Sequence, residues 1–196
     1  MDVRSWIRDE LALFSDRLHG AVVAHVPDDL WRTAVPAVVD GGPSSATFAG
    51  LLFHLSYHHD LAVSTAVLDR PPLLAEWRER LGIEGFEPEA GLSEQPDGPL
   101  VDALDLDALR AYAAQVGATT AVWATRVAAV ALDTIPAACR RLTQRAGVRQ
   151  EVVPWLHTMW DGKPVAWLVQ WEAIGHPLNH LGEMVALRNL LGLSPF

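Results

Sequence analysis

The sequence contains very little cysteine and lysine, and both scarcities restrict what the chain can be. Cys139 is the only cysteine among 196 residues, so no disulfide can form within the chain and we expect a reducing, cytoplasmic environment. We interpret Cys139 as a small core residue, with a catalytic thiol as the alternative. Lys163 is the only lysine against 14 arginines, a bias that, with abundant alanine, valine and leucine, indicates a GC-rich bacterial genome.

Excess positive charge and long apolar runs are also missing. The net charge of −9 argues against general binding to nucleic acid or anionic membranes, because phosphates are neutralised by clustered lysine and arginine. No apolar run reaches the length of a transmembrane helix, and the first ten residues predict no signal peptide. Half of the residues are hydrophobic and a fifth are charged, which predicts one globular domain over residues 1–196.

Apolar residues at helical spacing predict four long helices, over residues 3–26, 44–68, 105–135 and 164–191. Ser44 or Ser45 is the expected N-cap of the second helix, Asp105 or Asp107 that of the third, and Gly192 is expected to end the fourth. Residues 147–160 fit either an extended piece or a short helix. The chain is therefore predicted to be all-α.

Prolines, glycines and acidic residues over 69–104 predict a long connection between the second and third helices, with a short helix near 73–81. A 25-residue helix is about 37 Å long, and a connection of this length can cross that distance. We therefore predict a four-helix bundle whose second and third helices run parallel, joined by a crossover.

Two pairs of histidines stand out, each with the partners four residues apart. His54 and His58 lie on the second predicted helix, and His176 and His180 lie on the fourth. Residues at i and i+4 share one helix face, and both pairs fall on the apolar stripe of their helix. Imidazoles from two facing helices could therefore converge on a transition metal. Each histidine could instead be a core residue that bonds a backbone carbonyl.

The residues around these pairs suggest further contacts and one irregularity. Glu183 is placed to bond the imidazole of His180, or alternatively to form a surface pair with Arg188. Pro177 disfavours helical geometry at His176, so a kink or a restart of the helix is expected there. Asp60 lies far round the second helix and is expected to be solvated. Four tryptophans precede or accompany the second pair and could wall an apolar pocket: Trp155, Trp160, Trp167 and Trp171.

The chain resembles the DinB-like superfamily of four-helix bundles, which includes YfiT-type metal-dependent hydrolases, mycothiol-dependent maleylpyruvate isomerase and bacillithiol transferases. Its pattern has a histidine on helix two, and H-x-x-x-H-x-G-[QE] followed by L-x-x-L-x-G on helix four. His54 matches the first element; His176, His180, Gly182 and Glu183 match the second, and residues 187–192 follow as Leu-Arg-Asn-Leu-Leu-Gly.

This resemblance implies His54, His176 and His180 as metal ligands, with His58 as a possible additional ligand. It implies zinc or nickel as the metal and a small thiol, such as mycothiol, as cosubstrate. We therefore expect a metal-dependent small-thiol transferase or isomerase that acts on a small molecule, with Arg188 or the tryptophans shaping the substrate pocket. The alternatives are a metal-dependent hydrolase and a non-catalytic metal-binding or interaction bundle. A homodimer is the expected assembly.

Overall fold

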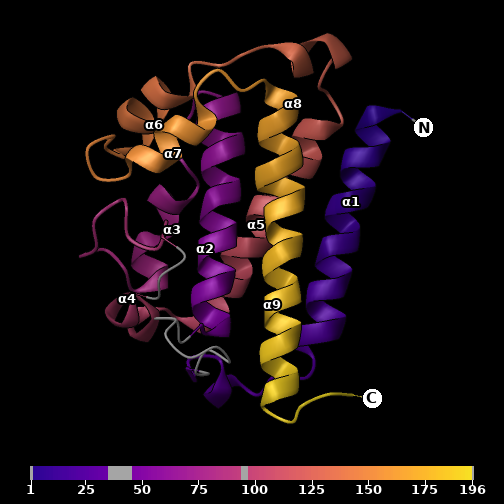
Figure 1. Cartoon of the computed structure of the whole chain (residues 1–196), viewed down its shortest axis with the longest axis vertical. Coiled ribbons are helices and arrows are strands. Elements are labelled where there is room, and N and C mark those ends of the chain that lie inside the picture. Colours follow the sequence, from indigo (N-terminus) through magenta and orange to yellow (C-terminus); the bar gives the residue numbers. More distant parts are fainter. Residues whose placement is uncertain (1, 35–45, 94–96, 196) are drawn as a thin grey trace.

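The computed structural model describes residues 2–34, 46–93 and 97–195, and they contain helices but no β-strand. The prediction of an all-α protein is therefore confirmed for the described part of the chain. No helix in these ranges is long and apolar enough to cross a membrane. Four long helical segments lie alongside one another (Figure 1): α1 (Val3–Leu18) continuing as η1 (His19–Val23), α2 (Phe48–Asp60) continuing as η3 (Leu61–Val67), α5 (Leu106–Ala124), and α8 (Val165–Leu168) continuing through η5 (Val169–Gly175) into α9 (His176–Leu190).

Side-chain oxygens cap the start of α2 and of α5. Thr47 Oγ1 accepts a hydrogen bond from the Gly50 amide at 3.0 Å, and α2 begins at Phe48. The expected caps Ser44 and Ser45 lie outside the described residues. Asp105, one of the two predicted caps of α5, accepts from the Ala108 amide at 2.8 Å. These bonds satisfy amide groups that have no partner inside the helix.

Helices α2 and α5 run parallel, as the long connection predicted. Near their N-termini, Trp31 accepts a hydrogen bond from the Ala49 amide through its carbonyl and stacks under the Arg110 guanidinium. Near their C-termini, His59 Nε2 lies 2.8 Å from Thr120 Oγ1. The crossover between them contains the predicted short helix, here α3 (Leu74–Leu81), and also α4 (Gly98–Ala103), which the sequence did not predict.

The predicted end of the third helix was wrong, because α5 ends at Ala124 and not near residue 135. After α5 the chain turns, which buries Val127 and Leu132 against the segment that begins at Val165. The Val165 amide donates to the Thr134 carbonyl at 2.9 Å and fixes this turn. Three short elements follow α5 before the last long segment: η4 (Ala129–Asp133), α6 (Ala138–Ala146) and α7 (Pro154–Trp160). The 147–160 stretch thus contains a short helix.

The irregularity expected at Pro177 takes the form of a π-helical turn, η5, after which α9 begins at His176, and the backbone stays helical throughout. His176 has φ −60° and ψ −48°, and Gly175 is also in the right-handed helical region. The preceding turn η5 is a π-helix, and the His176 amide donates to the carbonyl of Trp171, five residues earlier. This wider turn carries the chain into α9 with Pro177 in its first turn. His176 and His180 therefore keep their one-turn spacing.

Asp60 at the end of α2 is fully buried, contrary to the expectation that it is solvated. Its carboxylate accepts hydrogen bonds from the Leu73 and Leu74 amides at 3.0 and 2.9 Å. It also accepts from the hydroxyls of Ser64 and Tyr112 at 2.7 and 2.9 Å. Asp60 therefore fastens the start of the crossover to α2 and α5.

We expect Asp60→Asn to lower the free energy of unfolding by about 2–4 kcal/mol, because the new amide group would face donors that need an acceptor. Urea denaturation monitored by circular dichroism measures the change. The exposed Asp102→Asn is the matched control and should stay within about 0.5 kcal/mol of the parent. A loss at Asp60 no larger than that of the control would contradict the role given to this carboxylate.

Candidate metal centre

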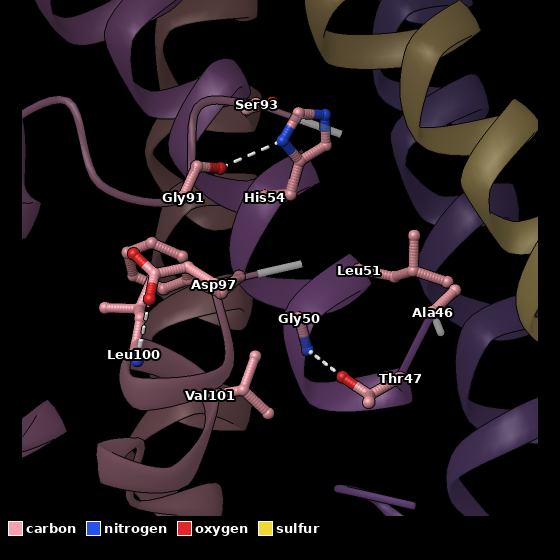
Figure 2. Close-up of a pocket in the computed structure, with 11 residues that line it drawn as sticks. Ala46, Thr47, Gly50, Leu51, His54, Gly91, Ser93, Asp97, Leu100 and Val101 are labelled. Carbon is pink, nitrogen blue, oxygen red and sulfur yellow. Dashed lines mark hydrogen bonds between the residues drawn. The ribbon is translucent and has the colours of Figure 1, made fainter. Parts of the chain in front are cut away.

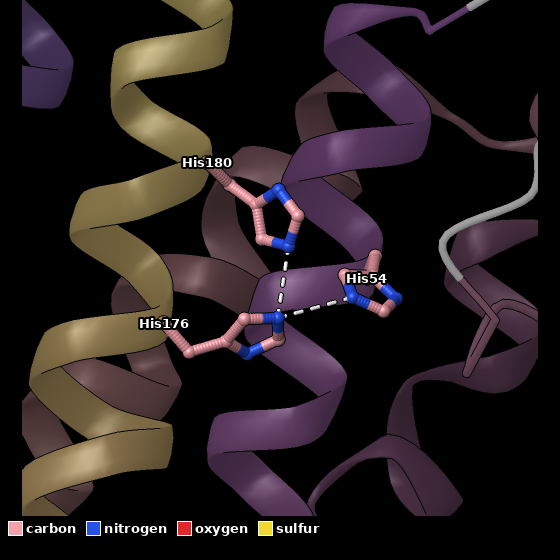
Figure 3. Close-up of side chains that lie close together, drawn as sticks. All are labelled: His54, His176 and His180. Atoms are coloured by element: carbon pink, nitrogen blue, oxygen red, sulfur yellow. Dashed lines mark hydrogen bonds between the residues drawn. The ribbon is translucent and has the colours of Figure 1, made fainter. Parts of the chain in front are cut away.

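Three histidines from α2 and α9 bring one nitrogen each to a common point (Figure 3). His176 Nε2 lies 3.2 Å from His54 Nε2 and 2.8 Å from His180 Nε2. All three side chains are buried. They form a group whose ligand atoms lie within 4.8 Å of one another. The structure thus brings together the three histidines predicted as ligands, and the antiparallel packing of α2 and α9 places them.

The opposite nitrogen of each ring faces an acceptor. His54 Nδ1 lies 2.9 Å from the Gly91 carbonyl, and His180 Nδ1 lies 2.9 Å from the Glu183 carboxylate. His176 Nδ1 lies 3.4 Å from Glu172 Oε2. Because carbonyl and carboxylate oxygens only accept, we assign the ring proton of each neutral histidine to Nδ1. Three Nε2 lone pairs then face one another, an arrangement that a cation stabilises.

Burial keeps the imidazoles of His54 and His176 neutral. Burial first, and then positive charge on the neighbouring His58, His176 and His180, lowers the pKa of His54 to about 2, although the Gly91 carbonyl opposes the shift. Burial likewise lowers the pKa of His176, although Glu172 opposes the shift. Metal ligation requires a deprotonated nitrogen, so the site needs to release few protons before it binds a metal at neutral pH.

Glu172 is the site residue that the sequence analysis missed. Its side chain is fully buried; Oε1 accepts from the Trp160 indole N–H at 2.6 Å, and Oε2 lies 3.3 Å from His58 Nδ1. Burial raises the pKa of this carboxyl, but the neighbouring His176 and His58 outweigh it and bring the pKa to about 2. A signal was present in the sequence, since Glu172 precedes His176 by four residues on the same helix face.

His58 belongs to a second group, formed with Glu172 and His176. His58 Nε2 lies 3.0 Å from the Leu92 carbonyl, so its Nδ1 faces Glu172. Three buried atoms of this group lack a hydrogen bond of ordinary geometry: His58 Nδ1, Glu172 Oε2 and His176 Nδ1. His58 therefore contacts the carboxylate behind His176, and its role as an additional ligand stays a prediction. The donor set, imidazole nitrogens with a buried carboxylate, fits a transition metal.

The other residues considered from the sequence have different roles. Arg188 is buried and donates to the Ala21 carbonyl, so it ties α9 to η1 and forms no surface pair with Glu183. Cys139 donates to the His157 carbonyl at 3.2 Å, and burial raises the pKa of its thiol, which disfavours a catalytic thiolate. A further buried histidine, His157, bonds the Val148 carbonyl through Nε2.

Two of the four tryptophans stack on histidines of the site. The Trp155 ring lies 5.9 Å from His58 and the Trp171 ring lies 6.0 Å from His176, between centroids. Trp155 is 44% exposed, so an aromatic surface next to the site is open to solvent. Trp167 stacks in turn on Trp171, whereas Trp160 is fully buried and bonds Glu172.

A small cavity reaches His54 from the side of the crossover (Figure 2). It has a volume of about 30 Å³, and its walls come from the start of α2, the 91–93 segment and α4. The Gly91 carbonyl that bonds His54 lies at its edge. A space of this size holds a water molecule but no organic substrate. Substrates therefore need another approach to the histidines, and the face with Trp155 is the candidate.

No family model and no curated protein sequence matches this chain.

We expect His54→Ala to lower zinc affinity more than 100-fold, a larger loss than the roughly 10- to 100-fold typical of residues that only orient a ligand. His58→Ala is the matched change one turn away and should cost about tenfold or less, because its nitrogen faces Glu172. Competition with a chromogenic chelator measures both affinities. Equal losses would mean a four-histidine site, which is closed to further ligands and speaks against catalysis.

We expect Glu172→Gln to lower zinc affinity by about 10- to 100-fold, because the variant removes the negative charge that fixes the proton on His176 Nδ1. The exposed Glu151→Gln provides a control with the same change in charge. Circular dichroism confirms that both variants are folded. An affinity equal to that of the control would contradict a role for Glu172 in the site.

Proposed function

We propose that the chain is a DinB-like metal protein, a four-helix bundle that acts as a metal-dependent transferase or isomerase on a small molecule with a small thiol of the mycothiol type. The observation that carries the proposal is the convergence of the Nε2 atoms of three buried histidines beside a partly exposed tryptophan. The parallel α2 and α5, and the histidines on the second and fourth long segments, support the assignment to this superfamily.

Three nitrogen ligands leave a coordination position for an exogenous group, as in catalytic zinc sites. Within the described ranges no fourth residue is grouped with His54, His176 and His180. Zinc or nickel suits imidazole ligands, whereas magnesium and calcium prefer oxygen. When bound, such a metal supplies positive charge that lowers the pKa of a thiol and holds it as the nucleophilic thiolate.

The protein groups around the metal position have distinct tasks in this proposal. Glu183 and Glu172 orient His180 and His176 and hold their protons on Nδ1. The Gly91 carbonyl does the same for His54. Trp155, exposed beside His58, offers an aromatic surface on which an apolar part of the electrophilic substrate packs. The site thus binds and orients both reactants without a nucleophile from the protein.

One observation favours a second candidate, a non-catalytic metal-binding bundle. His54 and His180 are only 4% exposed and His176 is 8% exposed, so bulky reactants have narrow access. A metal held at this depth would stabilise the packing of α2 against α9. The two candidates differ in whether an added thiol can reach the metal.

With cobalt substituted at the site, we expect mycothiol or N-acetylcysteine to produce a sulfur-to-metal charge-transfer band in the near ultraviolet. His180→Ala should abolish the band because it removes a ligand. The S-methyl derivative of N-acetylcysteine is the control and should produce no such band, since it cannot form a thiolate. A cobalt spectrum that saturating thiol leaves unchanged would reject the thiol chemistry, and metal-dependent hydrolysis or metal storage would then be the better account.

A further inference from the structure

A second cavity lies between α1, α2 and α5, away from the three histidines. Its volume is about 460 Å³, within the range of small-molecule sites. Most of its lining is apolar, with large side chains from α1, α2 and α5: Leu11, Phe14, Leu18, Leu52, Leu55 and Val116. A hollow of this size between packed helices forfeits apolar contacts unless something fills it.

The cavity and the metal centre use different faces of α2. Leu52, Leu55, Ser56 and His59 line the cavity and follow one another at helical spacing. His54 lies about 200° round the helix from Ser56, so it points to the opposite side, toward α9. The two sites can therefore be tested independently.

Ser56 gives the cavity an unsatisfied polar group. Its side chain is 2% exposed, and its hydroxyl has no hydrogen-bond partner among the residues that the structure describes. Buried hydroxyls are normally hydrogen-bonded, and an unpaired one is costly. A ligand that supplies an acceptor oxygen would satisfy the Ser56 hydroxyl.

Gly117 leaves open space on the α5 side of the cavity. A Cβ atom added there would meet nothing within 4 Å. Glycine inside a helix is destabilising, so packing inside the protein does not account for a glycine at this position. A larger side chain here would occupy space at this wall of the cavity.

Arg8 supplies a positive charge at the edge of the cavity. It is exposed and lines the cavity, and its side chain forms no hydrogen bond or ion pair with any described residue. Arg110, the other arginine of the lining, is paired with Asp28 and Asp107. In a chain with a net charge of −9, a free guanidinium beside an apolar cavity favours an anionic head group.

We propose that this cavity binds a single-chain carboxylate, with the aliphatic chain between α1, α2 and α5. The carboxylate accepts a hydrogen bond from the Ser56 hydroxyl and lies in the field of Arg8. The shape argues for a small molecule, because the lining is concave and three helices contribute to it. This site is additional to the function proposed above and does not depend on it.

Isothermal titration with hexanoate, octanoate and decanoate tests the proposal. We expect the affinity to rise about fourfold per methylene while the chain still fits. Gly117→Leu should weaken decanoate binding at least tenfold, roughly the effect of filling the space of a few methylenes. Gly20 is exposed, lies in a helix and is outside the cavity, so the Gly20→Leu variant should bind decanoate as the parent does.

Two further variants test the polar groups. Ser56→Ala should weaken decanoate by about 3- to 10-fold, the range of one hydrogen bond. Arg8→Gln should reduce the preference for decanoate over decan-1-ol by about 2- to 5-fold. Zinc affinity should not change in Gly117→Leu, so a loss of decanoate binding in this variant would not be due to a change in the metal site.

The proposal is overturned if decanoate does not bind the parent, or if it binds Gly117→Leu as well as it binds Gly20→Leu. Sedimentation velocity of both glycine variants tests whether a second copy of the chain, and not a small ligand, occupies this cavity. If Gly117→Leu changes the oligomeric state and decanoate does not bind, a second copy of the chain covers this face, and the ligand proposal fails.

Discussion

The packing of α2 against α9 brings three imidazole rings together, and the groups around them hold the rings in place. His176 Nε2 lies 3.2 Å from His54 Nε2 and 2.8 Å from His180 Nε2, and these atoms cannot all satisfy one another when the ring proton of each histidine is on Nδ1. A metal satisfies them together. The π-helical turn η5 contributes, because it carries the chain past Gly175 and Pro177 without a break and so keeps His176 and His180 one turn apart.

The carboxylates behind the histidines fix the orientation of the rings, although burying a carboxylate costs free energy. Glu172 is fully buried, yet its pKa stays low because His176 and His58 lie against it, and Trp160 donates to its other oxygen. Asp60 does comparable work at the end of α2, where its carboxylate fastens the crossover that carries Gly91 and Leu92 toward the site. The crossover is therefore part of the site, since its carbonyls bond His54 and His58.

Much of this arrangement could be predicted from the sequence, because helical spacing and histidine pairs are local signals. The four long segments and the two histidine pairs were of this kind. The parallel arrangement of α2 and α5 was predicted from the length of the connection, and the choice of His54, His176 and His180 followed from the family resemblance. The roles of Asp60 and Arg188 were not predicted, because burial of a charged side chain depends on groups distant in the chain, here the Leu73 amide and the Ala21 carbonyl. The end of α5 at Ala124 was missed for the same reason: the burial of Leu132 near Val165 decides it.

The most direct test of the metal centre is elemental analysis combined with X-ray absorption on protein purified without an affinity tag and then supplied with zinc. We predict about one equivalent of zinc, with a first shell of roughly three imidazole nitrogens near 2.0–2.1 Å. Less than about a tenth of an equivalent after addition of zinc or nickel, or a shell dominated by oxygen or sulfur ligands from the protein, would contradict the account.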